Sequence, residues 1–174
     1  MLHDLSRIPV LTTERLVLRG FRADDLGAFA AMLADPAVGA PKGFPAGADR
    51  GQAWAGLANV LGHWALRGFG LFAVTLGEDG TFVGAVGLIA PEGWPAPEAT
   101  WTIARPHQGR GYAREAAAAV RDHGFHALRL ERIVSFVPPG NEPSRRVAAA
   151  IGMRAEGTVR VFGDEAEMWV VEAG

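Results

Sequence analysis

The sequence predicts one α/β domain built around a mixed β-sheet. The chain has 174 residues, 49% of them hydrophobic, which is enough for one compact core and too few for two. Strand-like and helix-like segments follow one another in the order strand, two helices, three strands, helix, strand, helix, two strands. Since we find no internal repeat and no linker, we expect residues 1–174 to fold as a single domain.

The first three elements follow from charge and hydrophobic patterning. Basic and apolar residues alternate over residues 15–21, as in a half-buried strand. Asp24 and Asp25 then supply cap oxygens and negative charge for the start of a helix, which ends at an Asp-Pro pair. Glycine, proline and alanine dominate residues 39–51, which predicts a mobile loop, and a second helix follows over about residues 52–67.

The rest of the chain predicts six strands and two helices. A Gly-Glu-Asp-Gly run at residues 77–80 has the composition of a hairpin turn. Apolar residues recur at helical spacing over residues 112–128 and over the shorter segment 144–151. The predicted strands are residues 71–76, 82–90, 98–103, 133–137, 153–161 and 167–171.

Composition restricts the class of protein. The 17 basic and 19 acidic residues give a net charge of −2, so we expect no broad attraction to nucleic acid or to an anionic membrane. The absence of cysteine excludes a disulfide framework, a thiolate nucleophile and a cysteine-ligated metal, and it suits a reducing compartment. Residues 1–10 lack the apolar run of a signal peptide, and no segment reaches the ~20 apolar residues of a spanning helix. We therefore expect a cytoplasmic protein.

The segment Gln108-Gly109-Arg110-Gly111-Tyr112-Ala113 lies between a predicted strand and a predicted helix. Its two glycines allow backbone conformations that other residues avoid and a close approach to a ligand. Backbone amides at a helix N-terminus favour an anion, so the segment has the features of a phosphate cradle. An ordinary glycine-rich connection would have the same composition. Three arginines that could add charge-assisted hydrogen bonds stand around it: Arg105, Arg110 and Arg114.

We compared the segment with known phosphate-binding patterns to distinguish a phosphate cradle from an ordinary glycine-rich connection. A Walker loop needs Gly-Lys followed by Ser or Thr, and a Rossmann fingerprint needs a third glycine where this chain has Arg114. The pattern Gln-x-x-Gly-x-Ala resembles instead the pyrophosphate-binding motif of the GNAT (GCN5-related) N-acetyltransferase superfamily. Residues 11–38 and the segments Leu-Glu-Arg-Ile, Asn-Glu-Pro-Ser-Arg-Arg-Val and Ile-Gly-Met, beginning at residues 130, 141 and 151, resemble its RimJ/RimL-like branch.

The resemblance implies a mixed, mostly antiparallel sheet of about seven strands, splayed between strands 4 and 5 and flanked by about four helices. It implies an acyltransferase that transfers groups other than aminoacyl groups, with acetyl-CoA as co-substrate, its pantetheine arm in the splay. The acetyl group would pass directly to a primary amine, a protein or peptide N-terminus or a small molecule, within a ternary complex. The expected coenzyme contacts are Ile103, Arg105, Gln108, Gly109, Arg110, Gly111, Tyr112, Ala113 and Asn141. We expect no metal, since the histidines match no standard site.

Two residues carry the expected chemistry. Glu98 matches the family position that begins the strand before the pyrophosphate loop, where a carboxylate would accept the proton of the amine or attract it. It could equally be a strand-end charge facing solvent. Ser144 matches the position that reaches the coenzyme sulfur, although serine is also a common helix N-cap. Thr100 and Trp101 stand where the branch often has glycine and an aromatic residue, and we expect Trp101 to touch the acceptor.

Two other classes of function fit the same motif. A non-catalytic acyl-CoA sensor would bind CoA and keep its biological activity after Glu98→Gln and Ser144→Ala. A nucleotide-binding module would use the glycine-rich loop without pantetheine, and competition by CoA but not by ATP would exclude it. We expect a monomer or a homodimer, with the two C-terminal strands as the candidate interface.

Overall fold

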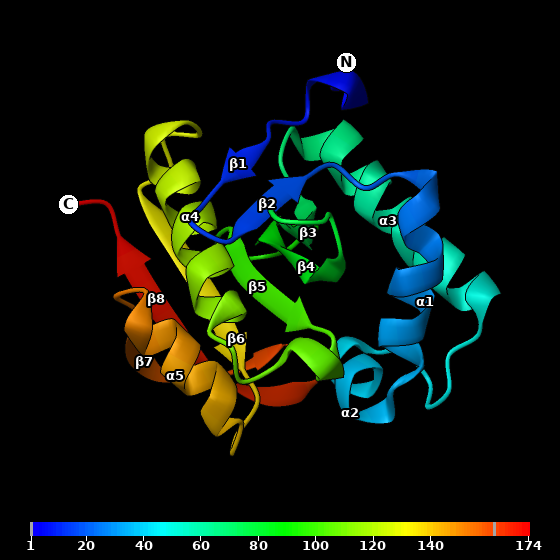
Figure 1. The fold of residues 1–174 in the computed structure, drawn as a ribbon. Coiled ribbons are helices and arrows are strands. Elements are labelled where there is room, and N and C mark those ends of the chain that lie inside the picture. Colours follow the sequence, from blue (N-terminus) through cyan, green and yellow to red (C-terminus); the bar gives the residue numbers. More distant parts are fainter. Residues whose placement is uncertain (1, 162) are drawn as a thin grey trace.

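A computed structural model describes residues 2–161 and 163–174. Its centre is an eight-stranded sheet in the order β1-β2-β3-β4-β5-β6-β8-β7 (Figure 1). The strands are β1 (Leu11–Thr12), β2 (Leu16–Arg19), β3 (Leu71–Leu76), β4 (Phe82–Ile89), β5 (Glu98–Ile103), β6 (Arg132–Val137), β7 (Arg154–Val161) and β8 (Asp164–Glu172). The α-helices are α1 (Leu26–Ala34), α2 (Pro36–Gly39), α3 (Arg50–Arg67), α4 (Tyr112–His126) and α5 (Glu142–Ala150).

The helices cover the two faces of the sheet separately. In Figure 1, α1 and α3 lie on one side, and α4 and α5 lie on the other. The larger core cluster joins the sheet to α4 through Ala116, Ala117 and Val120. The smaller cluster joins α1 to α3 through side chains such as Phe29 and Leu57. The two faces of each strand therefore look into different environments, which matters for the side chains of β5.

The sheet opens between β5 and β6. These two strands form the only parallel pair among the described strands, and their ladder contains a single register pair, Glu98 with Val134. The Val134 N–H donates to the Pro97 carbonyl at 2.9 Å, and beyond this point the strands separate. The predicted mixed sheet with a splay is confirmed. It has one strand more than expected, because β1 adds a two-residue edge to β2.

Three local expectations are corrected. The loop predicted over residues 39–51 is short, because α2 ends at Gly39, a 3₁₀ turn spans Ala40–Lys42 and α3 begins at Arg50. The carboxylate of Asp25 does not cap α1; it turns inward and accepts from the Arg19 guanidinium at 2.7 and 2.8 Å. Ser144 is not an N-cap: Asn141 caps α5, its Oδ1 accepting the Ser144 N–H at 3.1 Å.

Candidate functional site

The glycine-rich segment before α4 is shaped to receive an anion. Gly109 and Gly111 have φ angles of +76° and +83°, in the region that side chains disfavour, and Gly111 is the residue at which α4 begins. A Cβ at Gly109 would meet nothing within 4 Å, so the backbone faces open space there. The side chain of Gln108 turns back, and its Nε2 donates to the Ile103 carbonyl at 2.8 Å. The amides of the first turn of α4, beginning with Tyr112 and Ala113, therefore remain for a ligand.

A clamp from the N-terminal strands fixes this segment. The Glu115 carboxylate accepts from the Thr13 hydroxyl at 2.6 Å and from the Arg15 Nε at 2.7 Å. Arg15 Nη1 donates to the Arg110 carbonyl at 3.0 Å, and its guanidinium lies 4.8 Å from the Tyr112 ring centroid. Sequence reasoning missed these contacts because the clamp joins residues about 100 positions apart and no local motif marks it.

Some arginines near the segment are paired with carboxylates, whereas others have exposed side chains. The guanidinium of Arg105 is engaged by Asp35, with Nη2 2.7 Å from Oδ1. Arg110 and Arg114 have exposed side chains beside the start of α4. At α5, Arg145 is held by Glu142 and Glu167, whereas its neighbour Arg146 is exposed. The exposed arginines suit the outer, charged part of a polyphosphate ligand.

Glu98 lies at the point where the sheet opens. It is 8% exposed, and its Oε2 accepts from the Trp94 Nε1 at 2.9 Å. The backbone N–H of Phe136 in β6 also donates to the carboxylate, so the side chain occupies a place that a neighbouring strand would otherwise fill. Burial raises the pKa of Glu98, against the attraction of Lys42 and these two hydrogen bonds. A carboxylate with a raised pKa in a recess is suited to exchange a proton.

Ser144 lies across the gap from β5, near the start of α5. The Trp101 Nε1 donates to Ser144 Oγ at 3.3 Å, so the serine hydroxyl keeps its own proton for another acceptor. Trp101 packs on the α4 side of the sheet, whereas Thr100 and Thr102 line a cavity on the other side. Trp101 therefore contacts Ser144 on the α4 side, and its expected contact with the acceptor stays a prediction.

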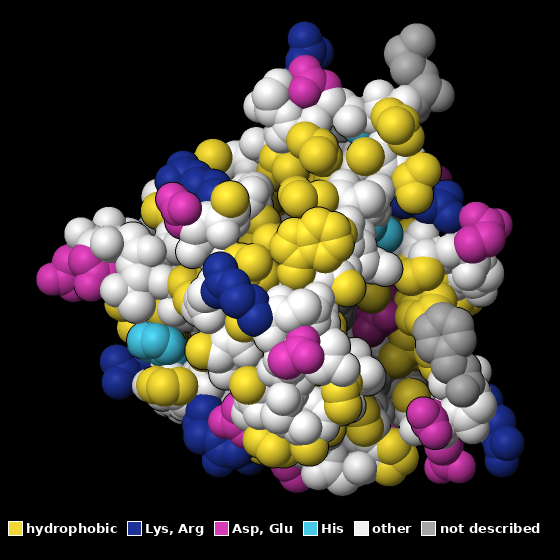
Figure 2. All heavy atoms as spheres, turned by 90° about the vertical axis from the view of Figure 1, so that its right-hand side faces the viewer, with side chains coloured by type: hydrophobic (Ala, Val, Ile, Leu, Met, Phe, Trp, Pro, Cys, Tyr) yellow, Lys and Arg dark blue, Asp and Glu magenta, His cyan; other side chains and the backbone are white. Residues whose placement is uncertain are grey.

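A cavity of about 580 Å³ lies between α1, α3 and the strands β3 to β5. Figure 2 shows the face that carries α1 and α3, hollowed to the right of centre, with an acidic side chain recessed in the hollow. The Lys42 Nζ donates to Thr100 Oγ1 at 2.8 Å at the wall of this cavity. Its apolar walls include Phe29, Leu33, Phe44, Val60, Leu71 and Ile89.

The cation of this cavity is partly desolvated. Lys42 is exposed as a residue, yet protein atoms surround its ammonium group, and this desolvation lowers the pKa of Lys42 against the attraction of Glu98. The sequence indicates no role for Lys42, because nothing local shows that the loop folds over β5.

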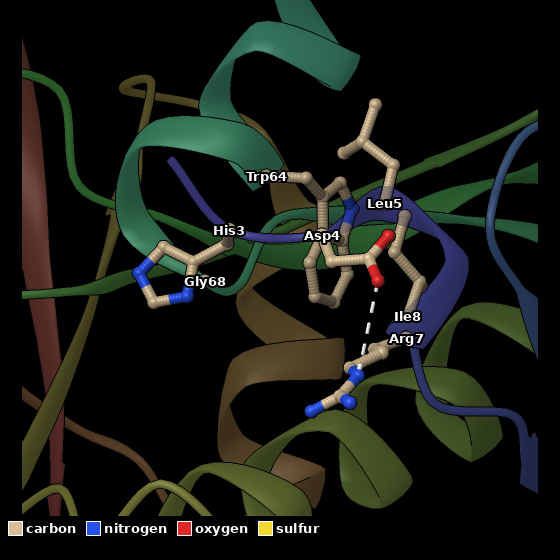
Figure 3. A pocket seen from close by; sticks show the side chains of 7 residues that line it. All are labelled: His3, Asp4, Leu5, Arg7, Ile8, Trp64 and Gly68. Atoms are coloured by element: carbon tan, nitrogen blue, oxygen red, sulfur yellow. Dashed lines mark ion pairs between the residues drawn. The ribbon is translucent and has the colours of Figure 1, made fainter. Parts of the chain in front are cut away.

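A second cavity, of about 120 Å³, lies where the N-terminal segment packs on the end of α3 (Figure 3). Asp4 and Arg7 face each other across it at 3.8 Å, with Trp64 behind them. None of the residues discussed above lines it. The splay, the glycine-rich segment and the larger cavity together form the candidate active site.

Comparison with known proteins gives this arrangement a family. A family model described as an acetyltransferase (GNAT) domain matches residues 15–154, which include Arg15 and Glu115 of the clamp, the glycine-rich segment, Glu98 and Ser144. The chain belongs to the GNAT acetyltransferase family. Members of this family transfer acetyl groups from acetyl-CoA.

Three similar proteins agree with this family assignment. The chain is 33% identical over 148 residues to an uncharacterized N-acetyltransferase, YnaD, of Bacillus subtilis, and the match covers 84% of each chain. It superimposes on an acetyltransferase from Agrobacterium tumefaciens with a TM-score of 0.83 and 32% identity over 95% of each chain. RimJ of Mycobacterium smegmatis, solved in complex with a CoA-disulfide, gives a TM-score of 0.76 and 26% identity over 95% of this chain and 87% of RimJ. The chain is thus a RimJ/RimL-like GNAT acetyltransferase.

The described residues contain neither a metal-binding cluster nor a membrane-spanning helix. Within residues 2–161 and 163–174, no group of three or more histidine, cysteine or acidic side chains is arranged to hold a metal ion. No helix in the same ranges is long and apolar enough to cross a membrane.

Proposed function

We propose that this protein transfers an acetyl group from acetyl-CoA directly to a primary amine, with Glu98 as the proton acceptor. The single observation that carries the proposal is the setting of Glu98, whose carboxylate is buried beside the parallel splay and has a raised pKa. An alkylamine is mostly protonated at neutral pH, so a group that removes its proton next to the acyl donor is required.

The residues of the glycine-rich segment fit the coenzyme. The amides of Gly109, Gly111 and Tyr112 would bind the pyrophosphate at the positive end of α4, with Arg110 and Arg114 as added cations. Gln108 acts through the Ile103 carbonyl, and Arg105 through Asp35, so both position the segment rather than neutralise phosphate. Asn141 orders the first turn of α5 around Ser144.

The backbone of β5 contributes to the acyl side. Residues of a strand direct their N–H and C=O groups alternately to either neighbour, and the Pro97 carbonyl already meets β6. Beyond the Glu98–Val134 register pair, the N–H and C=O of Trp101 therefore face the gap. They would hydrogen-bond a pantetheine amide and polarise the thioester carbonyl, as in strand addition and oxyanion stabilisation.

The transfer then needs two side chains. Glu98 takes a proton from the bound ammonium, the amine nitrogen forms a bond to the acyl carbon, and the C–S bond breaks. Ser144 donates a hydrogen bond to the departing sulfur, since its oxygen accepts from Trp101 and its hydroxyl proton is not used in that contact. After attack the nitrogen carries one proton more than an amide, and this proton passes to the thiolate directly or through water. Glu98 returns its own proton to solvent after the product leaves.

Substitution of Glu98 tests the proposal. Glu98→Gln keeps an oxygen for the Trp94 and Phe136 donors, so the fold is expected to persist, whereas proton acceptance is lost. We expect kcat/KM for acetyl-CoA-dependent amine acetylation to fall about 10²- to 10⁴-fold. The Kd for CoA, measured by calorimetry, should stay unchanged, and thiol release against amino acids, peptides and polyamines gives the rates.

Glu78→Gln, in the exposed turn between β3 and β4, is the matched control and should retain full activity. Undiminished turnover by Glu98→Gln would contradict the role of Glu98. Failure of the wild-type protein to bind CoA would contradict the function itself.

A further inference from the structure

We infer that the acceptor is a free α-amino acid with an apolar side chain, whose carboxylate binds Lys42 and whose side chain enters the 580 Å³ cavity. This inference rests on the proposed amine acetylation and specifies its substrate class. It is carried by the arrangement of one cation, one anion and an apolar cavity on one face of β5.

The two charges stand on the same face of one strand. Side chains two residues apart in a strand point the same way, so Glu98 and Thr100 share the face that looks toward α1 and α3. Their Cα atoms are about 7 Å apart along the strand. The Lys42 ammonium is held at Thr100 by the 2.8 Å hydrogen bond, and it attracts Glu98 without a direct ion pair between these described residues. An acceptor group can therefore lie between the two charges.

An α-amino acid matches this spacing and charge order. Its ammonium and carboxylate are separated by a single carbon, so the ammonium can meet Glu98 while the carboxylate meets Lys42. The pair also neutralises both protein charges, which are costly when partly desolvated and left without a partner. Since Glu98 is the proposed proton acceptor, the same contact orients the amine for attack.

The cavity accounts for the side chain. Its apolar walls come from α1, from α3 and from Phe44 of the loop, and its volume falls within the range of small-molecule sites. Burial of an apolar side chain there stabilises the complex, whereas burial of a charged one lacks a compensating partner apart from Lys42. An aromatic or large aliphatic amino acid is therefore favoured over glycine or aspartate.

Other acceptors fit less well. A polyamine would bring a second cation toward the Lys42 ammonium, and like charges in a recess repel. A peptide N-terminus has an amide in place of the α-carboxylate, so the Lys42 charge would lose its partner. Either class would have to bind with the cation of the site uncompensated.

Three matched acceptors test the role of the carboxylate. Phenylalanine, phenylalanine amide and phenethylamine share the amine and the ring, but only the first carries a carboxylate. In the thiol-release assay we expect wild-type kcat/KM to be about 10- to 100-fold higher for phenylalanine than for the other two, the factor typical of a hydrogen bond to a charged group. In Lys42→Met this ratio should fall to near one, while Lys42→Arg should retain most of it.

The control is Arg50→Met, which removes an exposed cation at the start of α3 and should leave the ratio unchanged. Equal wild-type use of the three acceptors would overturn the inference even if no Lys42 variant folds, and so would an unchanged ratio in Lys42→Met. Glycine used as well as phenylalanine would exclude the cavity as the side-chain site. Loss of thiol release with every amine, CoA binding being intact, would instead contradict the proposed function.

Discussion

Ser144 lies where α5 meets the open edge of β5. Its amide is held by Asn141, its oxygen accepts the Trp101 indole N–H, and its hydroxyl proton is uncommitted in these contacts. The sequence allowed a helix cap or a leaving-group role for this serine. Because Asn141 is the cap, the side chain of Ser144 is available for the second role.

Removal of the hydroxyl should affect turnover more than coenzyme affinity. In Ser144→Ala the departing sulfur loses a donor, and we expect kcat to fall about 10- to 100-fold, the range for a hydrogen bond to a charged group. Steady-state kinetics and calorimetric titration of CoA measure the two effects separately. Trp101→Phe deletes the indole N–H and keeps the serine hydroxyl, so its kcat should fall less. An equal loss in both variants would indicate that the pair acts only in packing.

The contacts around Glu98 show where residue-scale prediction stops. Glu98 was identified as the start of the strand before the glycine-rich segment, and Ser144 by its place in the Asn-Glu-Pro-Ser segment, and both are local patterns. Trp94, Phe136 and Lys42 reach Glu98 from a turn, from β6 and from a 3₁₀ turn. Only tertiary packing brings these segments together, so no local pattern in the sequence indicates their contact with Glu98.

At the scale of elements, α4 is positioned by more than its own sequence. Its first turn is tied to the strands β1 and β2 through Thr13, Arg15 and Glu115. Burial raises the pKa of Glu115, but hydrogen bonds from Thr13 and Arg15 outweigh that effect and the pKa lies below its ordinary value. The bound, ionised form of Glu115 therefore stabilises the fold above the unfolded-state pKa, and this contribution is lost as the pH falls through the folded-state pKa.

Loss of this clamp should loosen the phosphate cradle. In Glu115→Ala, Arg15 no longer has a partner to hold it against the Arg110 carbonyl, and we expect the free energy of unfolding to fall by about 1–3 kcal/mol. The Kd for CoA should rise several-fold, as seen by calorimetry, with denaturant titration giving the stability. Glu14→Ala, which removes an exposed carboxylate next to Arg15, is the control. Unchanged CoA affinity in Glu115→Ala would show that the segment keeps its shape alone.

The elements themselves were largely predictable, and their ends were not. Hydrophobic periodicity located β3 to β6, β8 and the helices α1, α3, α4 and α5, because each buries apolar side chains. The position of β7 was also predicted, although its side chains are mostly exposed. The two residues of β1 are too few to carry a period. The start of α5 was misjudged because Asn141 and Ser144 are both good caps, and only the geometry of the turn decides between them.

At the scale of the whole molecule, His63 joins three parts of the chain. On α3, its Nδ1 lies 2.8 Å from the Phe69 carbonyl, and its Nε2 lies 2.9 Å from the Ala90 N–H just after β4. A backbone N–H only donates and a carbonyl only accepts, so these contacts require a neutral ring with the proton on Nδ1. Burial lowers the pKa of His63, against the Phe69 hydrogen bond, and burial also lowers the pKa of His123.

Stability should therefore decline in mild acid. Below the unfolded-state histidine pKa of about 6.5, His63 and His123 bind protons in the unfolded chain but stay neutral in the folded chain. The free energy of unfolding is expected to be highest above that pH and to fall on acidification until the folded-state pKa values are reached, by at most about 1.4 kcal/mol per pH unit for each histidine. Urea titrations between pH 8 and pH 5.5 measure this slope.

His63→Gln tests whether His63 causes the loss of stability in acid, since the glutamine amide can donate to Phe69 and accept from Ala90 without titrating. The slope should decrease in this variant and stay the same in the surface variant His126→Gln. A slope that His63→Gln leaves intact would assign the acid sensitivity to other groups.

The hydrogen bond from the Phe136 amide to the Glu98 carboxylate ties the reactivity of one position to the integrity of the sheet. Where β6 departs from β5, a side chain supplies the acceptor that a neighbouring backbone would have given. Among amino acids of that length, glutamine keeps an acceptor oxygen but takes up no proton, and methionine or leucine offers neither. A redesign of this protein for larger acyl groups can change the other residues around the gap. Position 98 has to remain glutamate, because only glutamate both accepts the Phe136 hydrogen bond and takes up a proton.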